Sequence, residues 1–300
     1  MRTKTYLFAL MAMALTLGSC SDNENGIGGE TSKYITVSTS IGNMTRVATD
    51  ENGGQTFEEG DEISVYAWTG DATVAPETRE RVVNNAINKL TNGSWVSTPQ
   101  MLWKNNRDKH YFIGVYPISA ISDLSAGEYT FDVNKQTESD LLVAVNKDGL
   151  SYNVDEQQTV PLTFTHVMAK LVVNLTYKNQ WGGIPTVEKV VVGNAAKEAT
   201  INYLTKVVTP STTAKEDFSL PEITENTKYV SVIIPQEDVK QLTIVIGGKN
   251  FVYDNGTPFK LESGKITTVN LEVGRDEIKL GDVKITDWEN GSTFSGEALN

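Results

Sequence analysis

The chain has 300 residues, of which 39% are hydrophobic and 21% are charged, and its formal net charge at pH 7 is -12. This length predicts two domains, each long enough to build its own hydrophobic core. The acidic balance argues against binding to nucleic acid or to anionic lipid head groups. The single cysteine excludes an intrachain disulfide.

The N-terminal segment has the pattern of an export signal. A basic start precedes the apolar run 6–17, which is too short to span a bilayer. The sequence Leu-Gly-Ser-Cys at 17–20 resembles the bacterial lipobox, in which the chain is cut before the cysteine and the thiol is acylated. We therefore predict a lipoprotein signal peptide over 1–19, cleavage between Ser19 and Cys20, and lipidation of Cys20.

A tether and a first strand follow the signal. Residues 20–33 are acidic and rich in glycine, with little apolar weight, which is typical of a flexible linker. The stretch 34–41 then alternates, with Ile35, Val37 and Ile41 on one face, and this period of two predicts a strand with one buried face. Arg46 and Val47 come next, in a polar stretch with glycines that should be an exposed loop.

The remaining chain is predicted to be all-β, because short apolar runs recur with turn signals between them. Asn92-Gly93 is a strong hairpin signal. The run 162–175 alternates with a change of phase near Ala169, which indicates one module ending and another beginning. We therefore expect an N-terminal β-sandwich over 47–160 and a C-terminal β-sandwich over 161–300.

The sequence contains no recognisable catalytic motif. The two histidines, His110 and His166, show no metal-ligand spacing, and no nucleophile elbow occurs. We expect His110 at the surface and His166 at the corner between the domains, bonded to the backbone. We predict no enzyme and no catalytic, cofactor-binding or metal-binding residues, and we disfavour a hydrolase. The five tryptophans fit packing better than glycan stacking; they are Trp68, Trp95, Trp103, Trp181 and Trp288.

An ordered set of motifs extends over most of the chain. It resembles the fimbrillin-like family, the lipoprotein pilins of Bacteroides-type bacteria. The segments that carry this resemblance are Phe57–Trp68, Asn92–Trp95, Pro99–Trp103, His110–Pro117, Asp140–Ala144 and Leu162–Leu175.

The resemblance implies two transthyretin-like antiparallel β-sandwiches in tandem and a stalk, tip or accessory subunit of a type V fimbria that serves adhesion. It implies a lipid-anchored precursor on the outer membrane, which a trypsin-like protease cuts between Arg46 and Val47. This cut releases the prosegment strand 34–46, and a strand of a neighbouring fimbrial subunit then fills the groove that Ile35, Val37 and Ile41 leave.

The donor strand is expected within 278–299, although Gly281-Asp282 interrupts the alternation of that stretch. An alternative is a surface lipoprotein that binds glycan or host protein and never polymerises. Cleavage after Arg46 separates the two hypotheses, since such a binder has no use for it.

Overall fold

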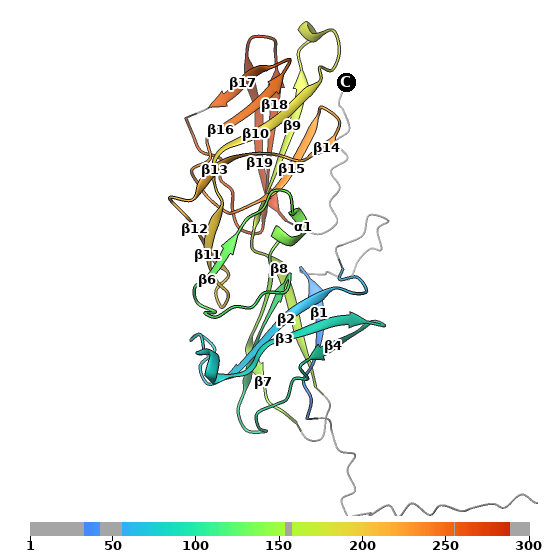
Figure 1. Cartoon of the computed structure of the whole chain (residues 1–300), viewed down its shortest axis with the longest axis vertical. Helices are drawn as coiled ribbons and strands as arrows, with labels where there is room; N and C mark the ends of the chain where they lie inside the picture. Colours follow the sequence, from blue (N-terminus) through green and yellow to red (C-terminus); the bar gives the residue numbers. More distant parts are fainter. Residues whose placement is uncertain (1–32, 43–55, 154–157, 255, 289–300) are drawn as a thin grey trace, which may run out of the picture. The chain divides into compact units, whose positions relative to one another are not determined.

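The computed structural model describes residues 33–42, 56–153, 158–254 and 256–288 (Figure 1). These residues form an all-β structure, which confirms the all-β class; the tandem transthyretin-like arrangement stays a prediction. Helical structure among them amounts to three short segments: η1 (Thr78–Glu80), α1 (Gln136–Ser139) and η2 (Asn179–Trp181). No helix in the described part of the chain is long and apolar enough to cross a membrane.

A seven-stranded sheet contains the first strands of the chain. Its order is β1-β8-β7-β5-β2-β3-β4. The strands are β1 (Thr36–Ile41), β2 (Glu62–Thr69), β3 (Arg81–Thr91), β4 (Ser94–Thr98), β5 (His110–Tyr116), β7 (Leu142–Leu150) and β8 (Thr159–His166). The predicted hairpin at Asn92-Gly93 joins β3 to β4, with positive φ at both residues, as a two-residue turn requires.

Three further sheets hold the later strands. Their orders are β13-β10-β16-β17, β12-β11-β6 and β14-β15-β9-β18-β19. The strands are β6 (Gly127–Thr130), β9 (Ala169–Tyr177), β10 (Val187–Ala196), β11 (Glu198–Asn202), β12 (Val207–Pro210), β13 (Lys215–Ser219), β14 (Glu222–Thr224), β15 (Lys228–Ile233), β16 (Gln241–Ile246), β17 (Lys249–Asp254), β18 (Lys265–Val273) and β19 (Ile278–Asp287).

The sheets are mixed rather than purely antiparallel. β1 runs parallel to β8, with Val37 opposite Val160 and Ile41 opposite Phe164. β18 runs parallel to β9. The antiparallel part of the prediction is therefore wrong for these two pairs. The period of two in the sequence reports which face is buried and carries no information about strand direction, which depends on the connections.

β6 links the two halves of the chain. It precedes residue 160, yet it pairs with β11, so that Gly127 lies opposite Ile201 and Thr130 opposite Glu198. The division near residue 160 remains a prediction. One strand that precedes this residue, β6, belongs to a sheet whose other strands, β11 and β12, follow it.

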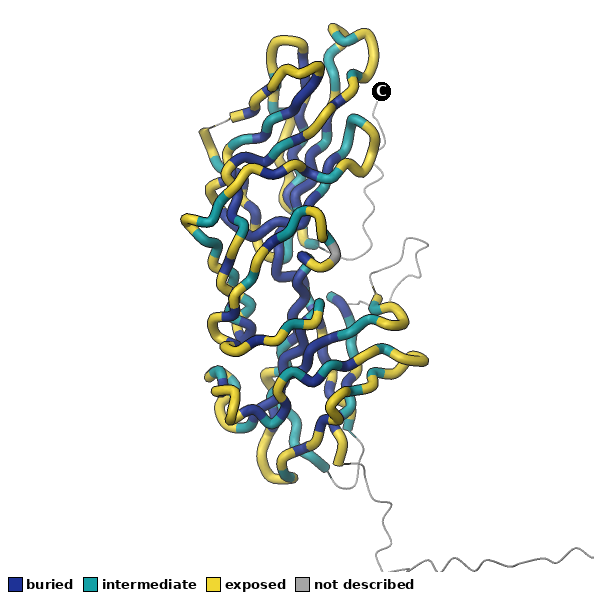
Figure 2. Tube along the Cα trace, viewed as in Figure 1, coloured by how far each residue is buried: buried dark blue, intermediate teal, exposed yellow. Residues whose placement is uncertain are grey.

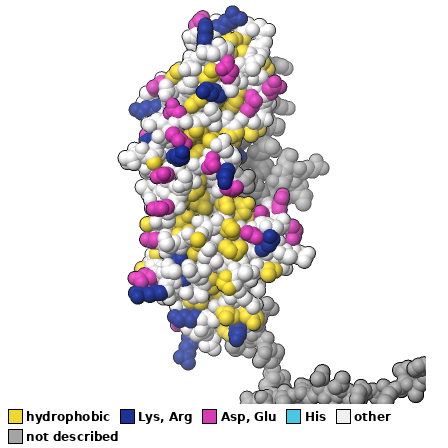
Figure 3. Space-filling model, in the orientation of Figure 1, with side chains coloured by type: hydrophobic (Ala, Val, Ile, Leu, Met, Phe, Trp, Pro, Cys, Tyr) yellow, Lys and Arg dark blue, Asp and Glu magenta, His cyan; other side chains and the backbone are white. Residues whose placement is uncertain are grey.

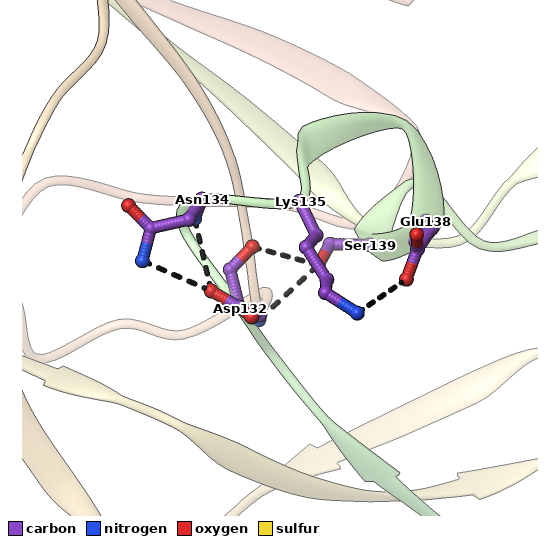
Figure 4. A network of polar contacts seen from close by, with 5 residues as sticks. All are labelled: Asp132, Asn134, Lys135, Glu138 and Ser139. Atoms are coloured by element: carbon purple, nitrogen blue, oxygen red, sulfur yellow. Dashed lines mark hydrogen bonds and ion pairs between the residues drawn. The ribbon is translucent and has the colours of Figure 1, made fainter.

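The connection from β6 to α1 is held by its own polar groups (Figure 4). The Asp132 carboxylate accepts hydrogen bonds from the amide and the side chain of Asn134, and the Ser139 hydroxyl donates to the Asp132 carbonyl oxygen at 3.0 Å. These bonds hold the connection in place, and Gln136 at its end contacts β15. Its Oε1 accepts a hydrogen bond from the Val232 amide at 2.6 Å.

Two hydrophobic clusters lie on opposite faces of the seven-stranded sheet, and Figure 2 shows the central strands as buried. In β2, Ile63 and Val65 contribute to one cluster, whereas Tyr66 and Trp68 contribute to the other. Burial on both faces explains why this strand reads as a nearly continuous apolar run. Phe164 is fully buried, as predicted.

Candidate functional site

The predicted prosegment strand is β1, and its apolar side chains belong to the core. Ile35, Val37 and Ile41 are 2%, 6% and 8% exposed. They contact the cluster that also contains Leu162 and Phe164 of β8. Burial of this kind stabilises a fold by about 1.5–3 kcal/mol per side chain. Loss of the strand would therefore leave a long apolar groove.

A short segment after β4 holds the beginning of β1. The Ile35 amide donates to the Met101 carbonyl oxygen at 2.9 Å, and the Trp103 amide donates to the Lys33 carbonyl oxygen at 3.2 Å. We call residues 101–103 the clasp. The clasp pairs with β1 on the edge opposite β8, so the first residues of the strand are held on both sides. Sequence patterns gave no indication of this contact.

Beyond the clasp, β1 and β4 are neighbours without a backbone ladder between them. The structure describes no backbone hydrogen bond between Thr36–Ile41 and β4, and one side-chain bond crosses the gap, from Trp95 Nε1 to Thr39 Oγ1 at 3.0 Å. We call this gap the seam. It forms a groove of about 750 Å³, lined by β1, the end of β3, the start of β4 and Phe57. Its volume is within the range of ligand-binding sites.

Aromatic rings line part of the seam, among them Phe57 and Trp95. Phe57 makes edge-to-face contacts with Trp95, Tyr116 and Phe164, with ring centroids 5.1–5.4 Å apart. Phe57, which precedes β2, therefore packs against side chains of β4, β5 and β8 beside the seam.

Within the predicted donor region, Ile278–Asp287 form β19, an edge strand of the five-stranded sheet, and residues 289–299 lie outside the described residues. A β-bulge at Gly281 lets Leu280 pair with Leu271 and Asp282 pair with Asn270. The extra residue restores the phase, so four apolar side chains lie on the face that carries the buried residues of β18. They are Ile278, Leu280, Val283 and Ile285. Gly281-Asp282 thus interrupts the sequence pattern without turning the second half of the strand over.

The apolar face of β19 is only partly covered. Val283 and Ile285 are 40% and 39% exposed, while Ile278 and Leu280 are partly buried. The strand is held mainly by its ladder to β18. Edge strands with exposed apolar side chains are sites at which another chain can pair.

Trp288 follows β19 and contacts β8 and β9. Its ring stacks on His166 with a centroid separation of 3.9 Å, and the Lys170 ammonium lies 5.3 Å from its centroid. His166 Nδ1 is 2.8 Å from Asp140 Oδ1, so a carboxylate is one of its partners, and the expected bond to the backbone stays a prediction. Burial lowers the pKa of Lys170, and the charge of Asp140 partly opposes this effect.

His110 is fully buried, which corrects the expectation that it lies at the surface. Its Nε2 accepts a hydrogen bond from the Lys104 amide at 3.0 Å, and Trp103 of the clasp packs against its ring edge to face. Burial lowers the pKa of His110, with smaller opposing effects from Asp108. The histidine is therefore a structural support for the clasp. Its sequence context, at the start of an alternating strand, did not reveal which side chains would cover it.

The remaining predicted site residues lie outside the described residues, and their roles stay predictions. They are Ser19, Cys20, Arg46 and Val47.

The described residues contain no group of three or more histidine, cysteine or acidic side chains that could hold a metal ion. Trp68 and Trp103 are buried, so their rings are not available for a sugar. On the face drawn in Figure 3, acidic and basic side chains are interspersed with hydrophobic ones.

Solved structures share this fold. A candidate cell adhesion protein from Bacteroides uniformis matches with a TM-score of 0.63 and 18% identity, over 85% of this chain and 98% of that chain. A candidate cell adhesion protein from Bacteroides ovatus gives 0.62 and 18% over the same shares. A fimbrial protein from Bacteroides vulgatus gives 0.53 and 13%, over 84% and 99%. No curated protein matches the chain.

The family model described as fimbrillin-like matches residues 45–288. The chain therefore belongs to the fimbrillin-like family, and the resemblance seen in its motifs is confirmed. This family consists of structural rather than catalytic proteins, which confirms that the chain is not an enzyme.

Proposed function

We propose that this protein is a subunit of a type V fimbria, that it reaches the outer membrane as a lipoprotein anchored through Cys20, and that cutting after Arg46 prepares it for assembly by strand exchange. Its partners are other fimbrial subunits and a trypsin-like protease. After processing it is part of a surface fimbrium that serves adhesion. The observation that carries the proposal is the placement of β1 as a core strand at a sheet edge.

Two properties of β1 support its role as a removable strand. Its three apolar side chains fill the core, so an empty groove would be strongly unfavourable in water. Its ladder joins it to β8 along one edge only over Thr36–Ile41. A strand at an edge can leave without breaking a second ladder, whereas a central strand cannot.

The C-terminal strand has the properties of a donor. β19 is an edge strand, and its bulge keeps four apolar side chains on one face. Main-chain hydrogen bonds would supply affinity, and these side chains would occupy the pockets left by Ile35, Val37 and Ile41.

The test is limited trypsin digestion of purified precursor, followed by N-terminal sequencing and size measurement, with Arg46→Ala as the matched control. We expect the wild type to be cut between Arg46 and Val47 and then to form oligomers, while Arg46→Ala stays monomeric. A wild-type protein that is cut there, remains monomeric and binds no peptide copying 34–45 or 278–299 would contradict strand exchange and favour a surface binder.

A further inference from the structure

We propose that the seam between β1 and β4 is the entry site for the incoming strand, which pairs there first and then displaces β1 from the Ile41 end toward the clasp. The proposal rests on the strand exchange described above and adds the place and direction of entry. The partner is the C-terminal edge strand of a second copy of this chain.

The backbone of β1 directs a row of amides into the seam. The Ile35 amide points toward the clasp, whereas the Gly42 amide donates to Phe164 of β8 at 2.8 Å. Successive peptide groups of a strand point to opposite edges. Three further amides therefore share the direction of Ile35 and face the seam: Val37, Thr39 and Ile41. Buried or half-buried backbone groups favour a partner.

β4 presents a second open edge to the same groove. Its two-residue turn makes Thr91 and Ser94 a hydrogen-bonded pair, so the amides that point to β3 are those of Ser94, Val96 and Thr98. The amides of Trp95 and Ser97 consequently point away from β3 and toward the seam. A groove with open backbone edges on both sides is suited to an extended peptide.

The two ends of β1 differ in how firmly they are held. At the start, the clasp and β8 both bond the strand. At the Ile41 end, the bond from Trp95 to Thr39 is the one hydrogen bond across to β4 that the described structure shows. An incoming strand can begin pairing at this end without first breaking a backbone ladder. Exchange then proceeds one residue pair at a time, each new pair with β8 replacing one pair between β1 and β8. The barrier is therefore lower than that for complete loss of β1 before binding.

β19 is the occupant that the structure favours. Of the other edge strands in the described residues, β1 and β4 themselves border the seam, and β17 has its aromatic residues Phe251 and Tyr253 buried. β13 has five residues, and β6, β12 and β14 have four or fewer. β19 has ten residues and four apolar side chains in phase that its own sheet covers incompletely. It can therefore offer both a backbone edge and side chains to the seam.

The test follows the release of the cut strand. Protein beginning at Cys20 carries a fluorophore on this single cysteine, and trypsin cuts it after Arg46, so anisotropy reports loss of the fragment 20–46. Lys33→Gln in every protein prevents a cut between the fluorophore and β1. A peptide copying 278–287 is the competitor. Ser97→Pro removes one seam-facing amide and leaves the ladder to β3 intact. Ser97→Ala is the matched control, because it loses the same hydroxyl and keeps the amide.

We expect the release rate to rise with peptide concentration. Ser97→Pro should lower this peptide-dependent rate about five- to tenfold, which is the effect of one lost backbone hydrogen bond. The peptide-dependent rate of Ser97→Ala should stay near that of the wild type. Release without peptide should be equal in the two Ser97 variants, because both lose the hydrogen bond that the Ser97 hydroxyl accepts from the Met101 amide of the clasp at 3.4 Å. If Ser97→Pro does not fold, two variants of the peptide take its place, one N-methylated on the amides of one edge and the other on the amides of the opposite edge. The set whose methyl groups lie on the edge that pairs with the seam should abolish the acceleration of release.

Two results would overturn the proposal. A release rate that does not depend on peptide concentration, although the peptide ends up bound, means that β1 leaves first; strand exchange then stands and the entry site is wrong. A peptide that never replaces the fragment rejects strand exchange and the entry site together.

Discussion

The contribution of β1 to the core can be measured with one side chain. Ile35 is 2% exposed and contacts the same cluster as Phe164. Replacing a buried isoleucine by alanine removes its transfer free energy and leaves a cavity, which costs about 2–4 kcal/mol. We therefore expect Ile35→Ala to lower the free energy of unfolding by this amount in urea denaturation of the uncut precursor.

The same substitution should lower the affinity of the protein body for the cut strand. Since about 1.4 kcal/mol corresponds to a factor of ten, the fragment carrying Ile35→Ala should bind the body roughly 30- to 700-fold less tightly than the natural fragment. Ser38→Ala, on the exposed face of the same strand, should change stability by less than about 0.5 kcal/mol. A loss below about 0.5 kcal/mol for Ile35→Ala would refute the reasoning, because removal of β1 would then leave no groove that demands a partner.

Three further outcomes follow from the structure and the sequence. A Cβ on Gly114 would lie 2.6 Å from Phe164 Cζ, so Gly114→Ala should destabilise the fold by about 1–3 kcal/mol, and a lower urea midpoint checks this. Burial depresses the folded-state pKa of His110, so its contribution to stability is present above the unfolded-state pKa of about 6.5 and is lost as the pH falls through the folded-state pKa. His110→Gln should therefore reduce the change in the free energy of unfolding between pH 7 and pH 5. Cys20→Ser should abolish incorporation of labelled fatty acid, and label retained by this variant would contradict lipidation.

Local patterns predicted the strands well and their partners poorly. The alternation of Ile35, Val37 and Ile41 identified both the strand and its buried face, because that pattern depends on one segment alone. The parallel pairing of β1 with β8 joins residues about 120 positions apart, and nothing in either segment specifies direction. The clasp is a related case, since its bonds to Lys33 and Ile35 come from backbone atoms that every residue has.

Gly281 shows how a sequence rule can mislead. The break in alternation at Gly281-Asp282 argued against a continuous donor strand. The extra residue forms a bulge opposite Asn270 and Leu271, which keeps Val283 in phase with Leu280. A bulge depends on the partner strand, so it cannot be distinguished from a strand end until the pairing is known. The aromatic contact between Trp288 and His166 was likewise invisible, because it joins side chains from distant parts of the chain.

The pairing of β6 with β11 affects the order in which the chain can fold as it emerges from a ribosome or an export channel. About 70 residues separate these strands, and about 120 separate β1 from β8. Both early strands therefore stay unpaired until β11 and β8 have emerged, and during this time their open edges can mispair with other chains. Such a protein should depend on holding factors during export, and its N-terminal half, produced alone, should aggregate rather than fold.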